Sequence, residues 1–276
     1  MIELPESNTL AKQLNETVVN KTIVKAQAAH SPHGFAFYNG EPAEYSDTLE
    51  SNSITKAAAY GGIVELAIEG GYWLEFNDGV NLRYLQKGSK SPAKHQLYLE
   101  LDDGNCLFAT IQMYGGIMLY SGSIHTDNMY HRAAREKPSP LTDLFNQEYF
   151  GSIVQTAPKN LSVKGLLATE QRIPGLGNGS LHDILWDAEI NPKTKVSSMS
   201  DKFLSRLFDS IKNVLKDMTD KGGKSTEKDI YGNPGGYDVI LSSKTVNYPC
   251  VRCGGTIVRK AYMGGNVYYC ENCQPI

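Results

Sequence analysis

The spacing of apolar residues along the chain changes from helical to alternating and back to helical. Residues 1–16 carry apolar side chains at helical spacing, and Pro5 suits a first helical turn, where a missing N–H costs little. From residue 22 to about residue 120, apolar and polar residues alternate in short runs. Turn-like segments at residues 69–71, 77–79 and 102–105 favour antiparallel hairpins. We therefore predict one helix followed by a β-sandwich or flattened barrel.

The second half of the chain has mainly helical spacing. Residues 125–140 are polar and contain proline, so we predict a linker there. Ser162 can cap a helix over residues 163–172, and a second helix follows that ends near Ala188. Ser200 can cap a third helix with one apolar stripe, which Gly222 and Gly223 can end.

Four of the five cysteines form two C-x2-C pairs separated by sixteen residues. Cys250, Cys253, Cys270 and Cys273 can complete a tetrahedron of thiolates around one structural Zn²⁺. The alternative, two disulfides, is poorer because the N-terminus has no export signal. About 30 residues bury too little apolar surface to fold unaided, so the metal would supply folding free energy. We expect Cys106, in an apparent strand, to be a small core residue.

These patterns define an α+β fold in three parts. We predict an N-terminal β-sandwich with a leading helix over residues 1–125 and a helical domain with a helix–two-turn–helix unit over residues 126–240. A zinc-finger hairpin over residues 241–276 completes the chain.

Composition favours an ordinary globular protein. Of its 276 residues, 41% are hydrophobic and 21% charged, and no apolar run approaches the roughly 20 residues that span a bilayer. We therefore expect a cytoplasmic monomer with no membrane partner. The net charge of −3 hides an asymmetry, because residues 1–158 have 11 basic and 18 acidic residues, whereas residues 159–276 have 16 and 12. A polyanion would meet the C-terminal part most favourably.

The turn at residues 174–178, Pro-Gly-Leu-Gly-Asn, suits a phosphate group. Its glycines allow close approach, and the helix that follows presents free N–H groups and the positive end of its dipole. Gly177 and Asn178 would lie at that helix start, and Lys164, one helix earlier, can supply a cation. The alternative is a simple connection between two helices.

Together with the cysteine hairpin, these motifs resemble the formamidopyrimidine-DNA glycosylase and endonuclease VIII family of base-excision repair enzymes. The resemblance covers nearly the whole chain. It rests on Glu-Leu-Pro-Glu at residues 3–6, a weaker match at residues 138–146, the helix–two-turn–helix segment at residues 163–192, and Cys-Glu-Asn-Cys-Gln at residues 270–274.

The resemblance implies a protein that binds damaged double-stranded DNA between two domains, flips out a base and cleaves its N-glycosidic bond. Lys164 and Asn178 fall on the family's phosphate-binding positions. Gln112, Met113 and Tyr114 occupy a loop that fills the space left by the flipped base. The alternative for Met113 and Tyr114 is ordinary sandwich core.

Three positions depart from the family pattern. The family's nucleophile is an N-terminal proline exposed by removal of methionine, but this chain has Ile2 there, so Met1 would remain and displace the α-amine by one residue. The family's hairpin lysine aligns with Gly62, although Lys94 can take that position if a long insertion is allowed. The zinc-finger arginine aligns with Gly265.

The candidate catalytic groups that remain are Glu3, Glu6 and the α-amine of Met1. Glu3 matches the family's catalytic carboxylate and could protonate the opening sugar or activate water; the alternative is a favourable charge at a helix N-terminus. We therefore predict a DNA glycosylase of base-excision repair, possibly without lyase activity. The alternative is a catalytically inactive binder of lesions, abasic sites or distorted DNA.

Overall fold

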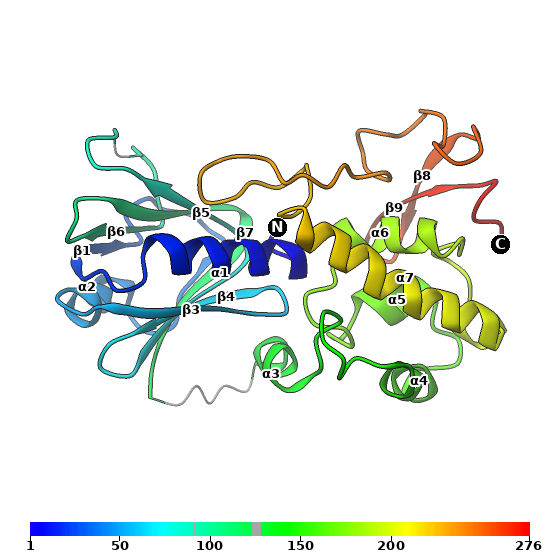
Figure 1. The fold of residues 1–276 in the computed structure, drawn as a ribbon, viewed down its shortest axis with the longest axis horizontal. Coiled ribbons are helices and arrows are strands. Elements are labelled where there is room, and N and C mark those ends of the chain that lie inside the picture. The colour runs from blue at the N-terminus through cyan, green and yellow to red at the C-terminus, as the bar shows by residue number, and fades with distance from the viewer. Residues whose placement is uncertain (91, 123–127) are drawn as a thin grey trace.

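The computed structural model describes residues 1–90, 92–122 and 128–276. The N-terminal strands and the C-terminal helices form two lobes side by side, and the N-terminus lies between them (Figure 1). Helix α1 (Leu4–Thr17) begins with a capping box between Glu3 and Glu6, and Pro5 stands in its first turn, as predicted. The helix contacts both lobes, because it packs on strand β3 and on helix α7.

The first lobe is built around one continuous seven-stranded sheet. Its order is β1-β6-β7-β5-β4-β3, with β2 paired to β7. The long strands β5 and β7 belong to both halves of the sheet, which encloses a core of alternating apolar residues. The strands are β1 (Ile23–Ala28), β2 (Ala36–Phe37), β3 (Ile54–Tyr60), β4 (Ile63–Ile68), β5 (Tyr72–Leu85), β6 (Leu97–Leu101) and β7 (Cys106–Ser121). The predicted turns at residues 69–71 and 102–105 are confirmed.

The prediction of a turn at residues 77–79 is wrong, because this segment lies inside β5. Asp78 pairs with Gly115 and Val80 pairs with Ile111, so residues 112–114 of β7 face the single residue Gly79. Such a bulge bends a strand without ending it, and Asp78 adopts a left-handed φ of 54° there. Cys106 is only half-buried at the start of β7, so its predicted place in the core is also wrong.

Residues 125–140, predicted to be a linker, contain helix α3 (Met129–Glu136). The side chain of Asn128 accepts a hydrogen bond from the N–H of Tyr130 and caps the helix. His131 Nε2 lies 2.7 Å from a carboxylate oxygen of Glu75 on β5, so polar contacts attach the helix to the sheet. The helix has only eight residues and buries His131 with two small alanines, Ala133 and Ala134, rather than large apolar side chains, which explains the error. The predicted boundary between residues 125 and 126 lies outside the described residues.

The second lobe contains the predicted helices. Ser162 caps α5 (Val163–Ala168) by accepting the N–H of Gly165, and α6 (Asn178–Asp187) follows the glycine turn. Helix α5 ends four residues early, since Glu170 and Gln171 adopt left-handed φ angles of 56° and 45°. Helices α4 (Gln147–Thr156) and α7 (Asp201–Asp220) complete its core. Ser200 precedes α7 without a side-chain capping bond.

The segment after α7 crosses from one lobe to the other. Ile230 is buried in the core of the sheet, whereas Tyr237 is buried in the helical core. The chain ends in a hairpin of β8 (Ile257–Tyr262) and β9 (Gly265–Cys270). The short helices are η1 (Pro42–Glu44), α2 (Tyr45–Leu49) and η2 (Val196–Ser198). No helix among the described residues is long and apolar enough to cross a bilayer.

Candidate DNA-repair site

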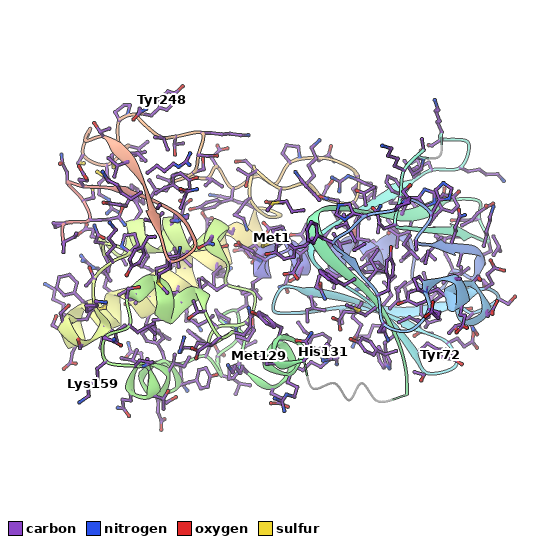
Figure 2. The ribbon with its side chains drawn as sticks, turned by 180° about the vertical axis from the view of Figure 1, so that it is seen from behind. Met1, Tyr72, Met129, His131, Lys159 and Tyr248 are labelled. Carbon is purple, nitrogen blue, oxygen red and sulfur yellow. The ribbon has the colours of Figure 1, made fainter. Side chains whose placement is uncertain are left out.

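A pocket of about 380 Å³ lies between the lobes. Its wall is made of residues 1–3, strands β5 and β7, helix α3 and the glycine turn at residues 175–177. Figure 2 shows Met1 between the two lobes and His131 on α3 beside the sheet. The pocket therefore brings the predicted catalytic N-terminus together with two segments of the predicted DNA-binding surface.

Glu3 joins the N-terminus to the start of α6. One carboxylate oxygen accepts the N–H of Gly179 at 2.8 Å, and the other accepts the N–H and the hydroxyl of Ser180 at 2.9 Å and 2.5 Å. A Cβ at residue 177 would collide with this carboxylate, so Gly177 permits the contact. The sequence predicted that the N-terminus of α6 binds a phosphate. In the structure the carboxylate of Glu3 occupies this anion-binding position.

Lys224 lies between the two N-terminal glutamates. Its ammonium is 3.1 Å from a Glu3 oxygen and 2.6 Å from a Glu6 oxygen, and its side chain is 2% exposed. Burial alone would raise the pKa of Glu3, but Lys224, Ser180 and Gly179 together lower it below its usual value. Glu3 is therefore held as a carboxylate.

Glu6 has a different environment from Glu3. Burial raises its pKa, and the nearby Glu3 charge adds to the rise while Lys224 opposes it. Its oxygens accept the N–H groups of Glu3 and Lys224 at 3.3 Å and 3.0 Å. Glu6 therefore positions Glu3 and Lys224, and it lines a separate small hollow near Gly223.

The two nitrogen atoms at the N-terminus are both hydrogen-bonded. The α-ammonium of Met1 forms an ion pair with Glu227 at 2.7 Å. The N–H of Ile2 donates to the carbonyl of Asp78 at 2.6 Å. The position that matches the family's attacking proline is thus an amide nitrogen, which carries no lone pair available for attack.

Gly62 lies directly against the N-terminus, at the β3–β4 turn. A Cβ at residue 62 would come within 2.9 Å of the carbonyl oxygen of Ile2. Gly175, with φ of 76°, packs on the backbone of Gly61 and Gly62. These contacts join the sheet to the glycine turn at the position where the family's hairpin lysine aligns.

The loop of Gln112, Met113 and Tyr114 projects from the sheet at the bulge. All three residues are exposed, and the exposed fraction of Met113 is 71%. Tyr114 lines the pocket, so the loop stands at its edge rather than in the sandwich core. The exposed position fits a wedge that fills a gap in a base stack.

Lys164 and Asn178 have unequal exposure. Asn178 is exposed at the first turn of α6. Lys164 is 3% exposed, and its ammonium donates to the carbonyl of Tyr262 at 2.7 Å, in the terminal hairpin. Burial lowers the pKa of Lys164. A Cβ at residue 265 would lie 3.7 Å from this ammonium, so Lys164 lies close to Gly265, the residue that aligns in sequence with the family's zinc-finger arginine.

The four paired cysteines meet at the base of the hairpin. All four sulfur atoms lie within 4.8 Å of one another. Cys250 Sγ is 3.8 Å from Cys273 Sγ, and Cys253 Sγ is 3.5 Å from Cys270 Sγ. Four Zn–S bonds in a tetrahedron place sulfur atoms about 3.8 Å apart. The four thiols therefore fit a metal ion of that geometry.

Sequence reasoning missed the side chains that bind Glu3 and the α-ammonium of Met1, and it missed pocket residues such as Tyr130 and His131. Lys224 and Glu227 follow α7 in a glycine-rich segment with no periodicity, and they reach the N-terminus only because the chain crosses between the lobes. Ser180 is an ordinary first-turn residue of α6, and no sequence signal marks its contact with Glu3.

Comparisons with known proteins agree with this geometry. The model of the formamidopyrimidine-DNA glycosylase N-terminal domain matches residues 1–112, and that of the formamidopyrimidine-DNA glycosylase H2TH domain matches residues 137–229. Formamidopyrimidine-DNA glycosylase of Mycobacterium avium (strain 104) is 28% identical over 287 residues, covering 100% of this chain and 99% of that protein. The enzyme of Corynebacterium efficiens is 27% identical over 290 residues, covering 100% of both.

Solved structures share the fold. The Lactococcus lactis Fpg in complex with DNA containing an abasic site has a TM-score of 0.84 and 21% identity, covering 99% of this chain and 100% of that one. MutM (Fpg) from Thermus thermophilus has a TM-score of 0.80 and 21% identity, and the match covers 99% of this chain and 98% of that one. The two matched models cover both lobes around the pocket and the relatives align along the whole length, so the chain belongs to the formamidopyrimidine-DNA glycosylase and endonuclease VIII family.

Proposed function

We propose that this protein is a DNA glycosylase that removes a damaged base from double-stranded DNA by hydrolysis, without a lyase step. The observation that carries the proposal is the ionised Glu3, buried at the start of α6 and lining the pocket between the lobes. Relatives of the same length are named formamidopyrimidine-DNA glycosylases, which points to oxidised or ring-opened bases as substrates.

In the proposed reaction, Glu3 acts as a general base. A water molecule attacks the sugar carbon that bears the base, and Glu3 accepts the proton that the water loses. The bonding electrons of the N-glycosidic bond leave with the base, which takes up a proton. A carboxylate whose pKa is lowered suits a base better than an acid, and Lys224 maintains that state.

The N-terminal contacts support a reaction without a lyase step. A Schiff base requires a free, uncharged amine, but the α-ammonium of Met1 is ion-paired with Glu227 at 2.7 Å. Ile2 provides only an amide nitrogen, and Gly62 lies against its carbonyl group. In this proposal Met1 lines the pocket and does not act as a nucleophile.

DNA would be held by the helix–two-turn–helix unit and the hairpin. Asn178 would donate to a phosphate, and Lys164 would add charge, since an ammonium has three donors and Tyr262 accepts one. The proposal keeps the division into residues 1–125, 126–240 and 241–276, with DNA between the first two parts. Gln112, Met113 and Tyr114 would fill the gap left by the flipped base.

We also propose that Cys250, Cys253, Cys270 and Cys273 hold one structural Zn²⁺. The sulfur distances fit a tetrahedron of four thiolates. Bound there, zinc would supply folding free energy to the hairpin and no open coordination position for chemistry.

Base release from a duplex that contains one formamidopyrimidine nucleotide tests the proposed activity. The expected result is release of the base while the strand stays intact until the abasic product is cleaved by alkali. Glu3→Gln should reduce release by a factor on the order of 100 or more, as for the loss of a general base. Glu148→Gln, a change at an exposed glutamate in the first turn of α4, is the matched control.

Borohydride trapping on abasic-site DNA separates the alternatives. Covalent attachment of DNA to the protein would contradict a purely hydrolytic enzyme, because only a Schiff base is trapped. Tight binding of damaged DNA with neither base release nor trapping would instead favour the second candidate, a binder of lesions. That candidate is supported by the replacement of the attacking proline with Ile2 and by Gly62 and Gly265 at the family's two basic positions.

A further inference from the structure

Four large apolar side chains are exposed next to the pocket. Phe35, Phe37, Met113 and Tyr114 have exposed fractions of 63%, 51%, 71% and 39%. We call these four residues the apolar ridge. Contiguous exposed apolar side chains on a soluble protein usually mark a binding surface.

The ridge is assembled from two segments that are far apart in the sequence. Strand β2 pairs parallel to β7, with Ala36 opposite Gly115 and Phe37 opposite Gly116. The N–H of Gly115 donates to the carbonyl of Phe35 at 3.1 Å. The two phenylalanines are therefore held beside the loop that carries Met113 and Tyr114. Gly116, opposite Phe37, leaves that ring uncovered from the neighbouring strand.

The sheet fixes the ridge in place. Residues 112–114 bulge out opposite Gly79, where the carbonyl oxygens of Gln112 and Tyr114 leave no room for a Cβ. Met113 adopts a left-handed φ of 68°, which turns its side chain out of the strand pattern. A surface held in this way loses little conformational entropy when a ligand binds.

The ridge is continuous with the pocket. Phe37 and Tyr114 line the same pocket as Met1 and Glu3. Tyr130 on α3 lines it too and is 57% exposed. The ridge therefore forms one edge of the pocket that holds Glu3. Nucleobases are flat groups that stack on aromatic side chains without sequence preference.

We propose that Phe35 and Phe37 form a second base-stacking site beside the wedge, which takes an unpaired base adjacent to the lesion. The inference rests on the proposed function and deepens it. Met113 and Tyr114 are assigned to the gap left by one flipped nucleotide. In a fully paired duplex the rings of Phe35 and Phe37 would then have no base to stack on. The preferred substrate class is then damaged DNA with unpaired nucleotides next to the lesion, as in a bubble or loop.

Binding to two DNAs with the same abasic-site analogue tests the inference. One is fully paired, and in the other the two base pairs beside the analogue are replaced by mismatches. The wild-type protein should bind the second DNA roughly tenfold more tightly, as expected for one added base–aromatic stack. In the double variant Phe35→Ala, Phe37→Ala, the ratio of the two dissociation constants should fall to about one.

Phe203→Ala is the matched control, because Phe203 is an exposed phenylalanine on α7 that contacts Arg206. This variant should keep the wild-type ratio. A 2-aminopurine placed beside the analogue should lose fluorescence on binding to wild-type protein and less on binding to the double variant. Equal wild-type affinity for both DNAs would overturn the second stacking site while leaving the proposed function standing. Failure to bind either DNA would instead contradict the proposed function itself.

Discussion

At the scale of single residues, Lys224 determines the charge state of Glu3. The ammonium is buried between two carboxylates, and their charges raise its pKa even though burial alone would lower it. The lysine therefore stays charged and keeps Glu3 ionised. Two buried glutamates without this cation would repel each other and take up protons.

Replacing the cation by Lys224→Met should destabilise the protein by about 3–5 kcal/mol at neutral pH, since it leaves buried charges unpaired. The pKa of Glu3 is lowered in the folded state, so its stabilisation is present above the unfolded value of 4.5 and is lost as the pH falls. The variant and the wild type should therefore converge in acid. Urea unfolding at pH 7 and pH 3 measures the difference, and the exposed Lys228→Met is the control from the same segment.

The same variant separates a chemical from a structural effect. Loss of Lys224 raises the pKa of Glu3, so the acidic limb of the pH profile for base release should move to higher pH. A variant with lower activity but an unshifted profile would show that Lys224 acts on folding alone.

At the scale of elements, helix α6 and the terminal hairpin meet at a buried histidine. His182 is 4% exposed, and its ring packs edge-on against Tyr268 with centroids 5.1 Å apart. Burial, followed by the charge of Lys164, lowers the pKa of His182 from 6.5 to about 4. Between these values the unfolded chain takes up a proton that the folded chain does not, so the free energy of unfolding falls as the pH falls.

The variant His182→Gln should therefore lose less stability than the wild type between pH 7 and pH 4.5, by a difference of about 2–3 kcal/mol. Asp183 opposes this trend, because burial raises its pKa from 3.8 to about 6, and its contribution falls as the pH rises through that window. Thermal unfolding at a series of pH values tests the prediction. Parallel stability curves for the two proteins would show that His182 does not titrate in this way.

Sequence patterns predicted elements well where periodicity sets the structure. The sequence predicted the apolar stripe of α7, the cap at Ser162 and the alternating strands, because each of these features depends on residues that are close in sequence. Helix α3 and the bulge at Gly79 were missed, since polar contacts with Glu75 and a register change against β7 determine them. The N-terminal motif singled out Glu3. No pattern singled out Lys224, because Lys224 and its partner Glu3 are 221 residues apart in the sequence.

At the scale of the whole molecule, we expect the hairpin to couple metal binding to DNA binding. Trp186 on α6 donates to Cys250 Sγ at 3.3 Å, and Arg252 stacks on its ring at 4.0 Å. Cys270→Ser should release zinc, unfold the hairpin and weaken DNA binding while the sheet remains folded. In a Trp73→Phe background, Trp186 fluorescence should change, whereas the circular dichroism of the sheet should persist. Reduced, pure protein without zinc would contradict this prediction.

We expect the interaction of the whole molecule with duplex DNA to depend on Lys164 and Asn178. One phosphate contact from an ammonium contributes about 0.9 to the slope of log K against log salt. Lys164→Met keeps the buried stem and should lower that slope by about one unit, while Asn178→Ala should weaken binding by about 0.5–1.5 kcal/mol with little change in slope. Fluorescence anisotropy over a range of salt concentrations measures both effects. The exposed Lys159→Met provides the control. An unchanged slope in a stably folded Lys164→Met protein would show that the ammonium serves only to attach the hairpin through Tyr262.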